Sequence, residues 1–203
     1  MPELDPIVTG KVVAVNAALR ASGLPYAFGG AIALGYCVPD PRGTADLDVN
    51  VFVPPSDAAA VLAALPAEVS HDASDLELLE RDGQVRLRWG ETSVDVFLST
   101  DVFHDGVAAA TRTVPFGRGA AEIPILPCAG LAVFKTFFAR PKDFIDIANM
   151  VEARSFDVPE VRRTIASLLG PDAPELAQFD AAVIDGRDPD RHEPKNRFPR
   201  PSA

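Results

Sequence analysis

Apolar side chains recur at two different spacings along this chain. At its start, Asp5 and Pro6 supply a helix cap and a first turn, and apolar residues follow at helical spacing until Gly23. This pattern predicts an amphipathic helix over residues 6–22. Short strand-like runs separated by turn residues fill most of the segment up to residue 126, and longer helical patterns follow it.

Three of the predicted strands contain polar residues of interest, and they lie at 26–28, 46–51 and 93–98. The first leads directly into the glycine pair Gly29-Gly30 and a short apolar helix. The second alternates apolar with polar side chains, so one of its faces is apolar and the other bears carboxylates. The third has a single charged residue within an apolar pattern.

The remaining patterns predict a helix from Pro55 and Ser56 to about 65, strands at 76–79 and 85–89, and helices at 127–138, 141–153, 159–169 and 174–184, while the chain past Phe103 is ambiguous until 123–126. Asp82-Gly83 is typical of a hairpin turn between two of these strands. From Gly186 onward the residues are mostly charged or proline, which predicts a tail without fixed structure. We therefore expect an α/β fold: a core with a small mixed sheet and helices at 1–126, a C-terminal helical lobe at 127–185, and a tail at 186–203.

Three carboxylates and a glycine pair make up the candidate site. Asp46 and Asp48 are separated by one strand residue, so their side chains leave the same face about 7 Å apart. Asp95 is a lone carboxylate in an apolar strand and needs a partner, for which a metal ion is the natural candidate. At Gly29 and Gly30, the absent side chains would let a phosphate approach the backbone. Carboxylates that hold Mg2+, together with a close approach to a triphosphate, are what nucleotidyl transfer requires.

The same residues carry a family resemblance. The stretches 29–35 and 42–48, followed by Asp95, resemble the signature of the polymerase-β-like nucleotidyltransferases. Lys135 and the run 140–146 make the chain most similar to the AbiEii-type members, which are toxins of abortive-infection and toxin-antitoxin systems.

The resemblance implies a role for each motif residue. Asp46, Asp48 and Asp95 would hold the metal ions. Asp95 would also help to deprotonate the acceptor, Lys135 would contact the triphosphate, and Asp143 would assist near the site. The residues that would further bind the nucleotide are Gly29, Gly30, Arg42, Thr44 and Asp146.

The resemblance also implies a reaction. A nucleoside monophosphate would pass from an NTP to an acceptor hydroxyl with two Mg2+ ions, or Mn2+ in their place. The acceptor would be a tRNA 3′ end or a protein, and a cognate antitoxin would be a partner.

Two alternatives to this function remain. The net charge of −10 would attract polycations, as in small-molecule nucleotidyltransferases of the aminoglycoside-modifying kind. The chain would otherwise be a non-catalytic nucleotide-binding or interaction module.

Several of these residues also have purely structural explanations. Lys135 could cover apolar neighbours on its helix with its methylene groups. Asp143 falls in a first helical turn, where the dipole favours it, and Asp146 could pair with a lysine four residues before it. Arg86 and Arg88 share one strand face, which is either an RNA contact or an ordinary exposed face.

The net charge, the cysteines and the hydropathy of the chain limit its expected partners and compartment. The negative net charge disfavours general nucleic-acid binding by bulk electrostatics. Cys37 and Cys128 have no metal-type spacing, and we predict two buried thiols in a reducing compartment rather than a disulfide. Neither a signal-like start nor a bilayer-length apolar segment occurs, so we expect a cytoplasmic protein without a membrane partner.

Overall fold

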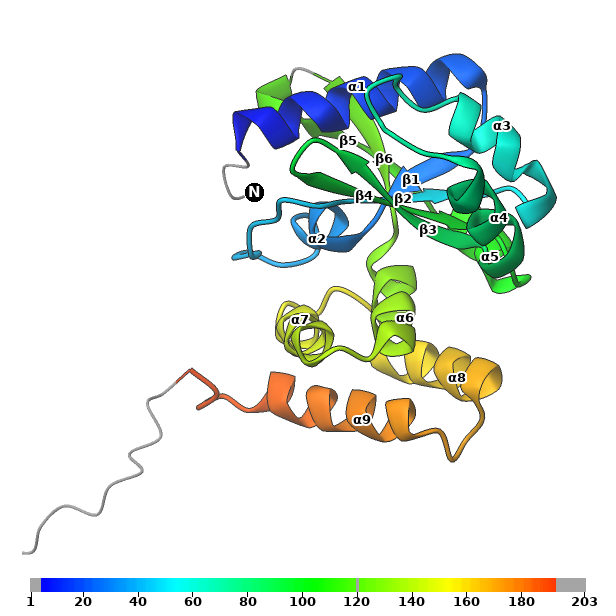
Figure 1. Ribbon diagram of the computed structural model, residues 1–203. Helices are drawn as coiled ribbons and strands as arrows, with labels where there is room; N and C mark the ends of the chain where they lie inside the picture. Colours follow the sequence, from blue (N-terminus) through cyan, green and yellow to red (C-terminus); the bar gives the residue numbers. More distant parts are fainter. Residues whose placement is uncertain (1–4, 120, 193–203) are drawn as a thin grey trace, which may run out of the picture. The chain divides into compact units, whose positions relative to one another are not determined.

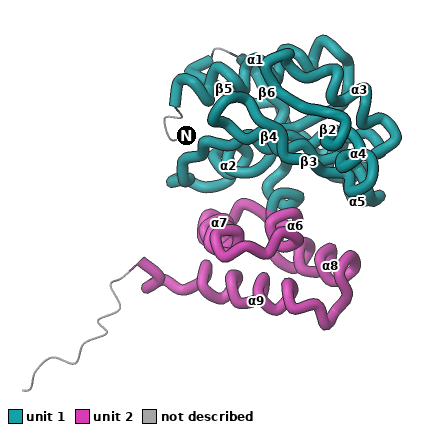
Figure 2. Tube along the Cα trace, in the orientation of Figure 1, with its two compact units in different colours: residues 1–131 teal, residues 132–203 magenta. Residues whose placement is uncertain are grey.

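The computed structural model describes residues 5–119 and 121–192 (Figure 1). The chain divides into two compact units, unit 1 at residues 1–131 and unit 2 at residues 132–203 (Figure 2). The division falls inside helix α6 (Cys128–Phe138), which starts in unit 1 and ends in unit 2. Within the described residues, no helix combines the length and the apolar character that a membrane crossing needs.

Unit 1 is built on a mixed sheet of six described strands in the order β3-β4-β2-β1-β6-β5. These strands are β1 (Tyr26–Phe28), β2 (Leu47–Val51), β3 (Gln84–Trp89), β4 (Thr92–Leu98), β5 (Arg112–Phe116) and β6 (Ala121–Ile125). The helical segments are α1 (Pro6–Ser22), α2 (Gly30–Leu34), α3 (Ala58–Ala63), α4 (Ala73–Asp82) and α5 (Phe103–Ala109), with 3-10 turns η1 (Pro55–Asp57) and η2 (Gly117–Gly119). Together with the C-terminal helices α6 to α9, this sheet confirms the predicted α/β fold class.

The predicted first helix is confirmed as α1, which lies along one side of the sheet in Figure 1. Asp5 caps it by accepting a hydrogen bond from the Ile7 N–H at 2.7 Å, and Gly23 ends it at a φ of 75°. The apolar residues that the periodicity placed on one face are buried, and these include Val8, Val12, Val15 and Leu19. The burial of this face anchors α1 to the core.

The predicted strand at 76–79 is wrong, because these residues belong to helix α4. Asp72 caps this helix and accepts hydrogen bonds from the backbone, while the Asp75 side chain accepts one from the Asp72 N–H. This reciprocal capping box starts the helix, and Gly83 ends it at a φ of 67°. A short apolar run does not by itself distinguish a strand from a helix, and here the caps decide.

The predicted hairpin turn at 82–83 is therefore also wrong. The turn between β3 and β4 is formed by Gly90 and Glu91, and Gly90 has a φ of 58°. The register that follows from this turn places Arg86 directly opposite Asp95. The position of a two-residue turn thus decides which side chains meet across the sheet.

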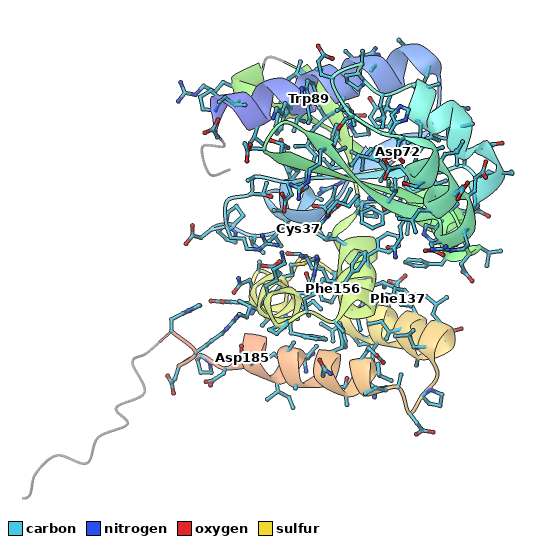
Figure 3. All side chains as sticks on the ribbon, in the orientation of Figure 1. Cys37, Asp72, Trp89, Phe137, Phe156 and Asp185 are labelled. Atoms are coloured by element: carbon cyan, nitrogen blue, oxygen red, sulfur yellow. A yellow bond between two sulfur atoms is a disulfide. The ribbon has the colours of Figure 1, made fainter. Side chains whose placement is uncertain are left out.

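The prediction of two separate buried thiols is wrong as well. Cys37, labelled in Figure 3, forms a disulfide with Cys128, and their Cα atoms are 5.8 Å apart. Cys37 lies in the turn after α2, and Cys128 is the first residue of α6, 91 positions later. Folding brings the two together although their spacing carries no motif, so the argument from free thiols to a reducing compartment no longer applies.

Unit 2 is helical, and its predicted helices are confirmed: the second part of α6, then α7 (Pro141–Glu152), α8 (Val158–Leu169) and α9 (Pro174–Arg187). A proline near the first turn helps to start each of the last three. At Gly186, a Cβ atom would lie 2.3 Å from the Ala148 carbonyl oxygen, so the glycine allows α9 to pack closely on α7. α9 runs beyond its predicted end at Ile184, and residues 193–203 of the predicted tail lie outside the described residues.

Candidate functional site

A row of charged side chains crosses three neighbouring strands of unit 1. The parallel register of β2 and β4 aligns Asp48 with Asp95, and the antiparallel register of β3 and β4 aligns Asp95 with Arg86. Residues in register on adjacent strands share a face and are separated by about one strand spacing, roughly 4.8 Å between backbones. The sheet therefore places two carboxylates and a guanidinium side by side.

Asp48 packs against the glycine turn between β1 and α2. A Cβ atom on Gly30 would lie 1.8 Å from Oδ2 of Asp48, and Gly30 adopts a φ of 50°. Both facts require glycine at this position, since any side chain would collide with the carboxylate and strain the backbone. Gly30 thus leaves the space in which the Asp48 carboxylate lies.

Gly29 fits the same face of β2 just as closely. Its N–H donates a hydrogen bond to the Asp48 carbonyl oxygen at 2.8 Å. A Cβ atom on Gly29 would lie 2.7 Å from Nδ2 of Asn50, the next polar residue on this face. The glycine pair is consequently a packing element, and it covers the polar face of β2.

Asp46 immediately precedes β2 and is half-buried. The Thr44 hydroxyl accepts a hydrogen bond from the Asp46 N–H and donates one to the Asp46 carbonyl oxygen, both at 3.1 Å. Thr44 therefore fixes the backbone where the carboxylate pair begins. Arg42 is exposed in the same loop.

Asp95 has Arg86 as its partner. The Arg86 guanidinium donates to both carboxylate oxygens at 2.7 Å, from Nε to Oδ1 and from Nη2 to Oδ2. The Asp95 side chain is only 10% exposed, whereas that of Arg86 is 55% exposed. The hydrogen bonds to Asp95 and then its charge raise the pKa of Arg86, with smaller contributions from Asp46 and Asp48. Arg86 thus lies within the electrostatic field of all three carboxylates.

A divalent cation at this site would draw its protein ligands from the three carboxylates. Within residues 5–119 and 121–192, no three His, Cys, Asp or Glu side chains converge as a metal site requires. Mg2+ commonly takes one or two carboxylates and completes its shell with water and phosphate oxygens. Asp46 and Asp48 meet that need, whereas both oxygens of Asp95 are engaged by Arg86. Asp46 and Asp48 would hold one cation, and the use of Asp95 for a second would require the Arg86 pair to open.

The other predicted residues, Lys135, Asp143 and Asp146, come together in unit 2. The Lys135 ammonium lies 2.6 Å from Oδ2 of Asp146 and 3.4 Å from Oδ1 of Asp143. All three side chains are buried, and Lys135 is only 4% exposed. These ion pairs join α6 to α7, so the Lys135 side chain does not extend to the surface. Asp146 does pair with a lysine, but the partner is Lys135 and not the lysine four residues before it.

Arg140, whose side chain is 42% exposed, completes this network. Its Nε atom lies 2.6 Å from Oδ2 of Asp143, and the Asp143 carboxylate in turn accepts from the Arg140 backbone N–H at 3.3 Å. Burial raises the pKa of Asp143, but the hydrogen bond from Arg140 and the charges of Lys135 and Arg140 outweigh it, and the pKa lies below its ordinary value. Two acids and two bases therefore balance in charge at the start of α7.

Two residues of this arrangement, Arg86 and Asn50, were not predicted as site residues. The alternation on this strand predicts that Arg86 is an RNA contact or part of an exposed face, and that pattern does not contain the register with Asp95. A turn at Gly90-Glu91 would have placed it opposite Asp95. Asn50 continues the Asp46, Asp48 alternation on β2, and that alternation was the available signal.

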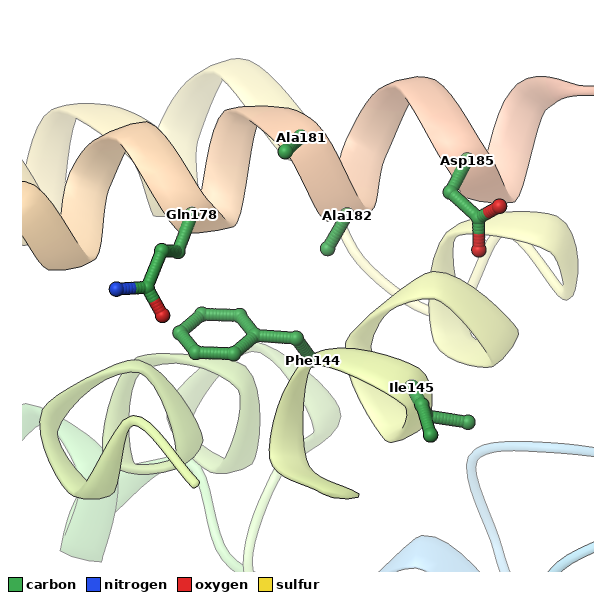
Figure 4. A pocket seen from close by; sticks show the side chains of 6 residues that line it. All are labelled: Phe144, Ile145, Gln178, Ala181, Ala182 and Asp185. Carbon is green, nitrogen blue, oxygen red and sulfur yellow. The ribbon is translucent and has the colours of Figure 1, made fainter. Parts of the chain in front are cut away.

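A separate hollow of about 300 Å³ lies in unit 2, between α7 and α9 (Figure 4). Its lining residues are Phe144, Ile145, Gln178, Ala181, Ala182 and Asp185. Asp185 is the only ionisable residue of this lining, and it already pairs with Arg191 at 2.9 Å. The hollow lacks the paired acids and bases of a catalytic site, so the candidate chemistry remains with the carboxylates of unit 1.

Comparison with known proteins bears on the fold over most of the chain. No protein-family description matches the sequence, and no curated protein matches it. An antigenic nucleotidyltransferase-like protein from Paracoccidioides brasiliensis, known from a crystal structure, matches with a TM-score of 0.50 at 16% identity, over 91% of this chain and 90% of that one. The antibiotic-resistance factor ANT(2'')-Ia, known from a solution structure, matches with a TM-score of 0.46 at 13% identity, over 89% of this chain and 91% of that one. The chain has a nucleotidyltransferase-like fold.

Proposed function

We propose that the chain is a metal-dependent nucleotidyltransferase. The observation that carries the proposal is the row of Asp48 and Asp95 across β2 and β4, with Asp46 at the start of β2 and the glycine turn packed beside it. In the reaction, an acceptor oxygen bonds to the α-phosphorus of an NTP. The bond from that phosphorus to the bridging oxygen breaks, pyrophosphate leaves with the electron pair, and the acceptor gives up its proton.

Asp46, Asp48 and Asp95 would be the metal ligands, for two Mg2+ ions or Mn2+ in their place. Bound cations would neutralise phosphate charge and align the attacking and leaving oxygens. The close approach of Asp48 to Gly30 and the hydrogen bonds of Thr44 to the Asp46 backbone support a role for both residues in holding a cation. Asp95 would help to deprotonate the acceptor, for which Arg86 must release at least one of its oxygens.

Each unit contains residues that the family resemblance connects with the nucleotide. In unit 1, the proposed contacts are with Gly29, Gly30, Arg42 and Thr44, of which Arg42 is an exposed cation in the loop before β2. In unit 2, the resemblance assigns Lys135 to the triphosphate and Asp143 and Asp146 to its surroundings. The burial and ion pairs of Lys135 support a framework role for these three residues more strongly than a direct phosphate contact.

The acceptor is proposed to be a tRNA 3′ end or a protein side chain, as in toxins whose cognate antitoxin holds them in check. With a net charge of −10, the surface as a whole would repel an RNA backbone, so a tRNA would have to be recognised locally. The same acidity favours a second candidate, nucleotidyl transfer to a polycationic small molecule of the aminoglycoside kind.

The test is a transfer assay with each α-labelled NTP and Mg2+, offered total tRNA, protein and an aminoglycoside as separate acceptors. The controls are Asp46→Asn and Asp48→Asn, which keep the shape of each side chain and remove its charge. We expect label on one acceptor with the wild type and none with either variant, while circular dichroism shows both variants folded. Wild-type-level transfer by the Asp46→Asn, Asp48→Asn double variant would overturn the proposed mechanism.

The identity of the labelled acceptor decides between the candidates. Label on tRNA or protein supports the toxin-like function, and label that depends on the aminoglycoside supports the small-molecule function. NTP binding without transfer to any acceptor would instead indicate a nucleotide-binding interaction module.

A further inference from the structure

Arg86 occupies an unusual place for a surface arginine, because it faces the carboxylates of the proposed catalytic site. Its guanidinium engages both oxygens of Asp95 at 2.7 Å, from a strand directly in register with it. Its neighbour on the same strand face, Arg88, instead donates to the Ser93 hydroxyl at 3.2 Å. Of these two arginines, Arg86 is the one that pairs with a carboxylate of the site.

A guanidinium and a divalent cation make the same demand on Asp95. A guanidinium and a divalent cation each bind carboxylate oxygens. An arginine that donates to both oxygens of one carboxylate leaves a cation only oxygens that already accept hydrogen bonds. The positive charge of Arg86 also opposes a cation near Asp46 and Asp48, since all three carboxylates act on this guanidinium. The pairing of Arg86 with Asp95 therefore competes with the binding of two cations at the site.

We propose that Arg86 is a built-in counter-ion that competes with a divalent cation for Asp95. While Arg86 is on Asp95, Asp46 and Asp48 would hold one cation, and a second would be admitted only when Arg86 leaves Asp95. This inference rests on the proposed function, because it concerns how the cations of that site are loaded. It makes Arg86 a positioning residue, since it acts through Asp95.

The surroundings of Arg86 allow it to leave. Its side chain is 55% exposed, and β3 is the first strand in the order of the sheet, so the guanidinium can turn towards solvent without disturbing the core. The triphosphate of an incoming nucleotide offers another bidentate partner, because arginine binds phosphate in the same fork geometry as carboxylate. Nucleotide binding would thereby free Asp95 for the second cation.

The test is equilibrium binding of Mn2+ to the full chain without nucleotide, followed by the electron paramagnetic resonance of free Mn2+. Arg86→Gln is compared with the wild type and with Arg88→Gln, a matched control that removes the same charge from the same strand face. We expect one Mn2+ per chain for the wild type and for Arg88→Gln. Arg86→Gln should bind a second Mn2+, or bind the first about tenfold more tightly, which corresponds to about 1.4 kcal/mol.

A double variant shows whether the gain comes from Asp95. Arg86→Gln combined with Asp95→Asn should lose the additional Mn2+ binding, because the released carboxylate is no longer present. Arg86→Lys, which keeps the charge but not the fork, should fall between the wild type and Arg86→Gln, and it serves in place of Arg86→Gln if that variant does not fold.

The inference is overturned if Arg86→Gln, folded by circular dichroism, binds Mn2+ with the number and affinity of the wild type. It is equally overturned if Arg88→Gln produces the same gain, since the effect would then be one of net charge. Failure of the proposed function has a different signature. The wild type would then bind Mn2+ no better than the Asp46→Asn, Asp48→Asn double variant, whatever residue stands at position 86.

Discussion

The two units of this chain each contain a buried aspartate paired with an arginine, yet the two pairs have different surroundings. In unit 1, Arg86 is more than half exposed, and beyond its partner Asp95 lie two further carboxylates. In unit 2, Asp143 is fully buried and pairs with Arg140, and Lys135 with Asp146 completes a network of two bases and two acids. An open pair beside excess negative charge is suited to exchange partners, whereas a closed and balanced network is suited to hold helices together.

The largest effect is expected from opening the closed network. Lys135→Met keeps a long side chain but leaves Asp143 and Asp146 buried without the ammonium between them. We expect a loss of about 3–5 kcal/mol in the free energy of unfolding, measured with urea. Lys142→Met, which removes an exposed lysine of α7, should change it by less than about 0.5 kcal/mol. Equal effects of the two substitutions would refute the framework role of Lys135.

The next effect concerns the glycine turn that supports the open site. Gly30→Ala places a methyl group where the Asp48 carboxylate lies and at a positive φ. We expect a loss of about 2 kcal/mol in unfolding free energy and a weakened Mn2+ affinity, because Asp48 must move. Gly10→Ala is the control, since its Cβ atom meets nothing within 4 Å, and alanine in helix α1 should add about 0.5–1 kcal/mol. A Gly30→Ala variant as stable as the wild type would show that Asp48 is free to move.

The open pair should contribute little to stability. Arg86→Gln removes an exposed guanidinium whose partner is near the surface of the site, and we expect a loss of about 1 kcal/mol or less in urea unfolding. A loss as large as that of Lys135→Met would contradict the distinction between the two pairs, because Arg86 would then be part of the framework.

The smallest effect on the free energy of unfolding is expected from lowering the pH from neutral to about 4, because Asp143 stays ionised over that range. The pKa of Asp143 lies below its ordinary value of 3.8, so its contribution to stability is complete above that value and is lost as the pH falls through the lower, folded-state pKa. Urea unfolding should therefore show no loss from Asp143 between pH 7 and about pH 4. Below this range, the difference in stability between the wild type and Asp143→Asn should shrink. A difference that stays constant to pH 2 would exclude this linkage.

The fold was largely predictable because its signals are local. Asp5, Pro6 and Gly23 mark the ends of α1, and the alternation through β2 identifies the face that bears Asp46 and Asp48. The signal that residues 76–79 are helical is local too, since Asp72 and Asp75 form the capping box that starts α4.

The site residues were predictable only where their positions follow from the pattern within one strand. The partner of Asp95 depends on the register across a hairpin, and the disulfide of Cys37 with Cys128 joins residues 91 positions apart. Such contacts are fixed by how distant elements pack, and the composition or spacing around each residue does not contain them. The burial of Lys135 against two aspartates is of the same kind, because it depends on how α7 packs against α6.

Asp46 and Asp48 are proposed to support nucleotidyl transfer, and the most direct test is the stoichiometry of the reaction. The wild type is incubated with Mg2+, the acceptor and NTP labelled at either the α or the γ phosphate. We expect one pyrophosphate released for each α label incorporated, with both products at background for the Asp46→Asn, Asp48→Asn double variant. Release of the γ label as inorganic phosphate without incorporation of the α label, or equal incorporation by the double variant, would contradict the claim.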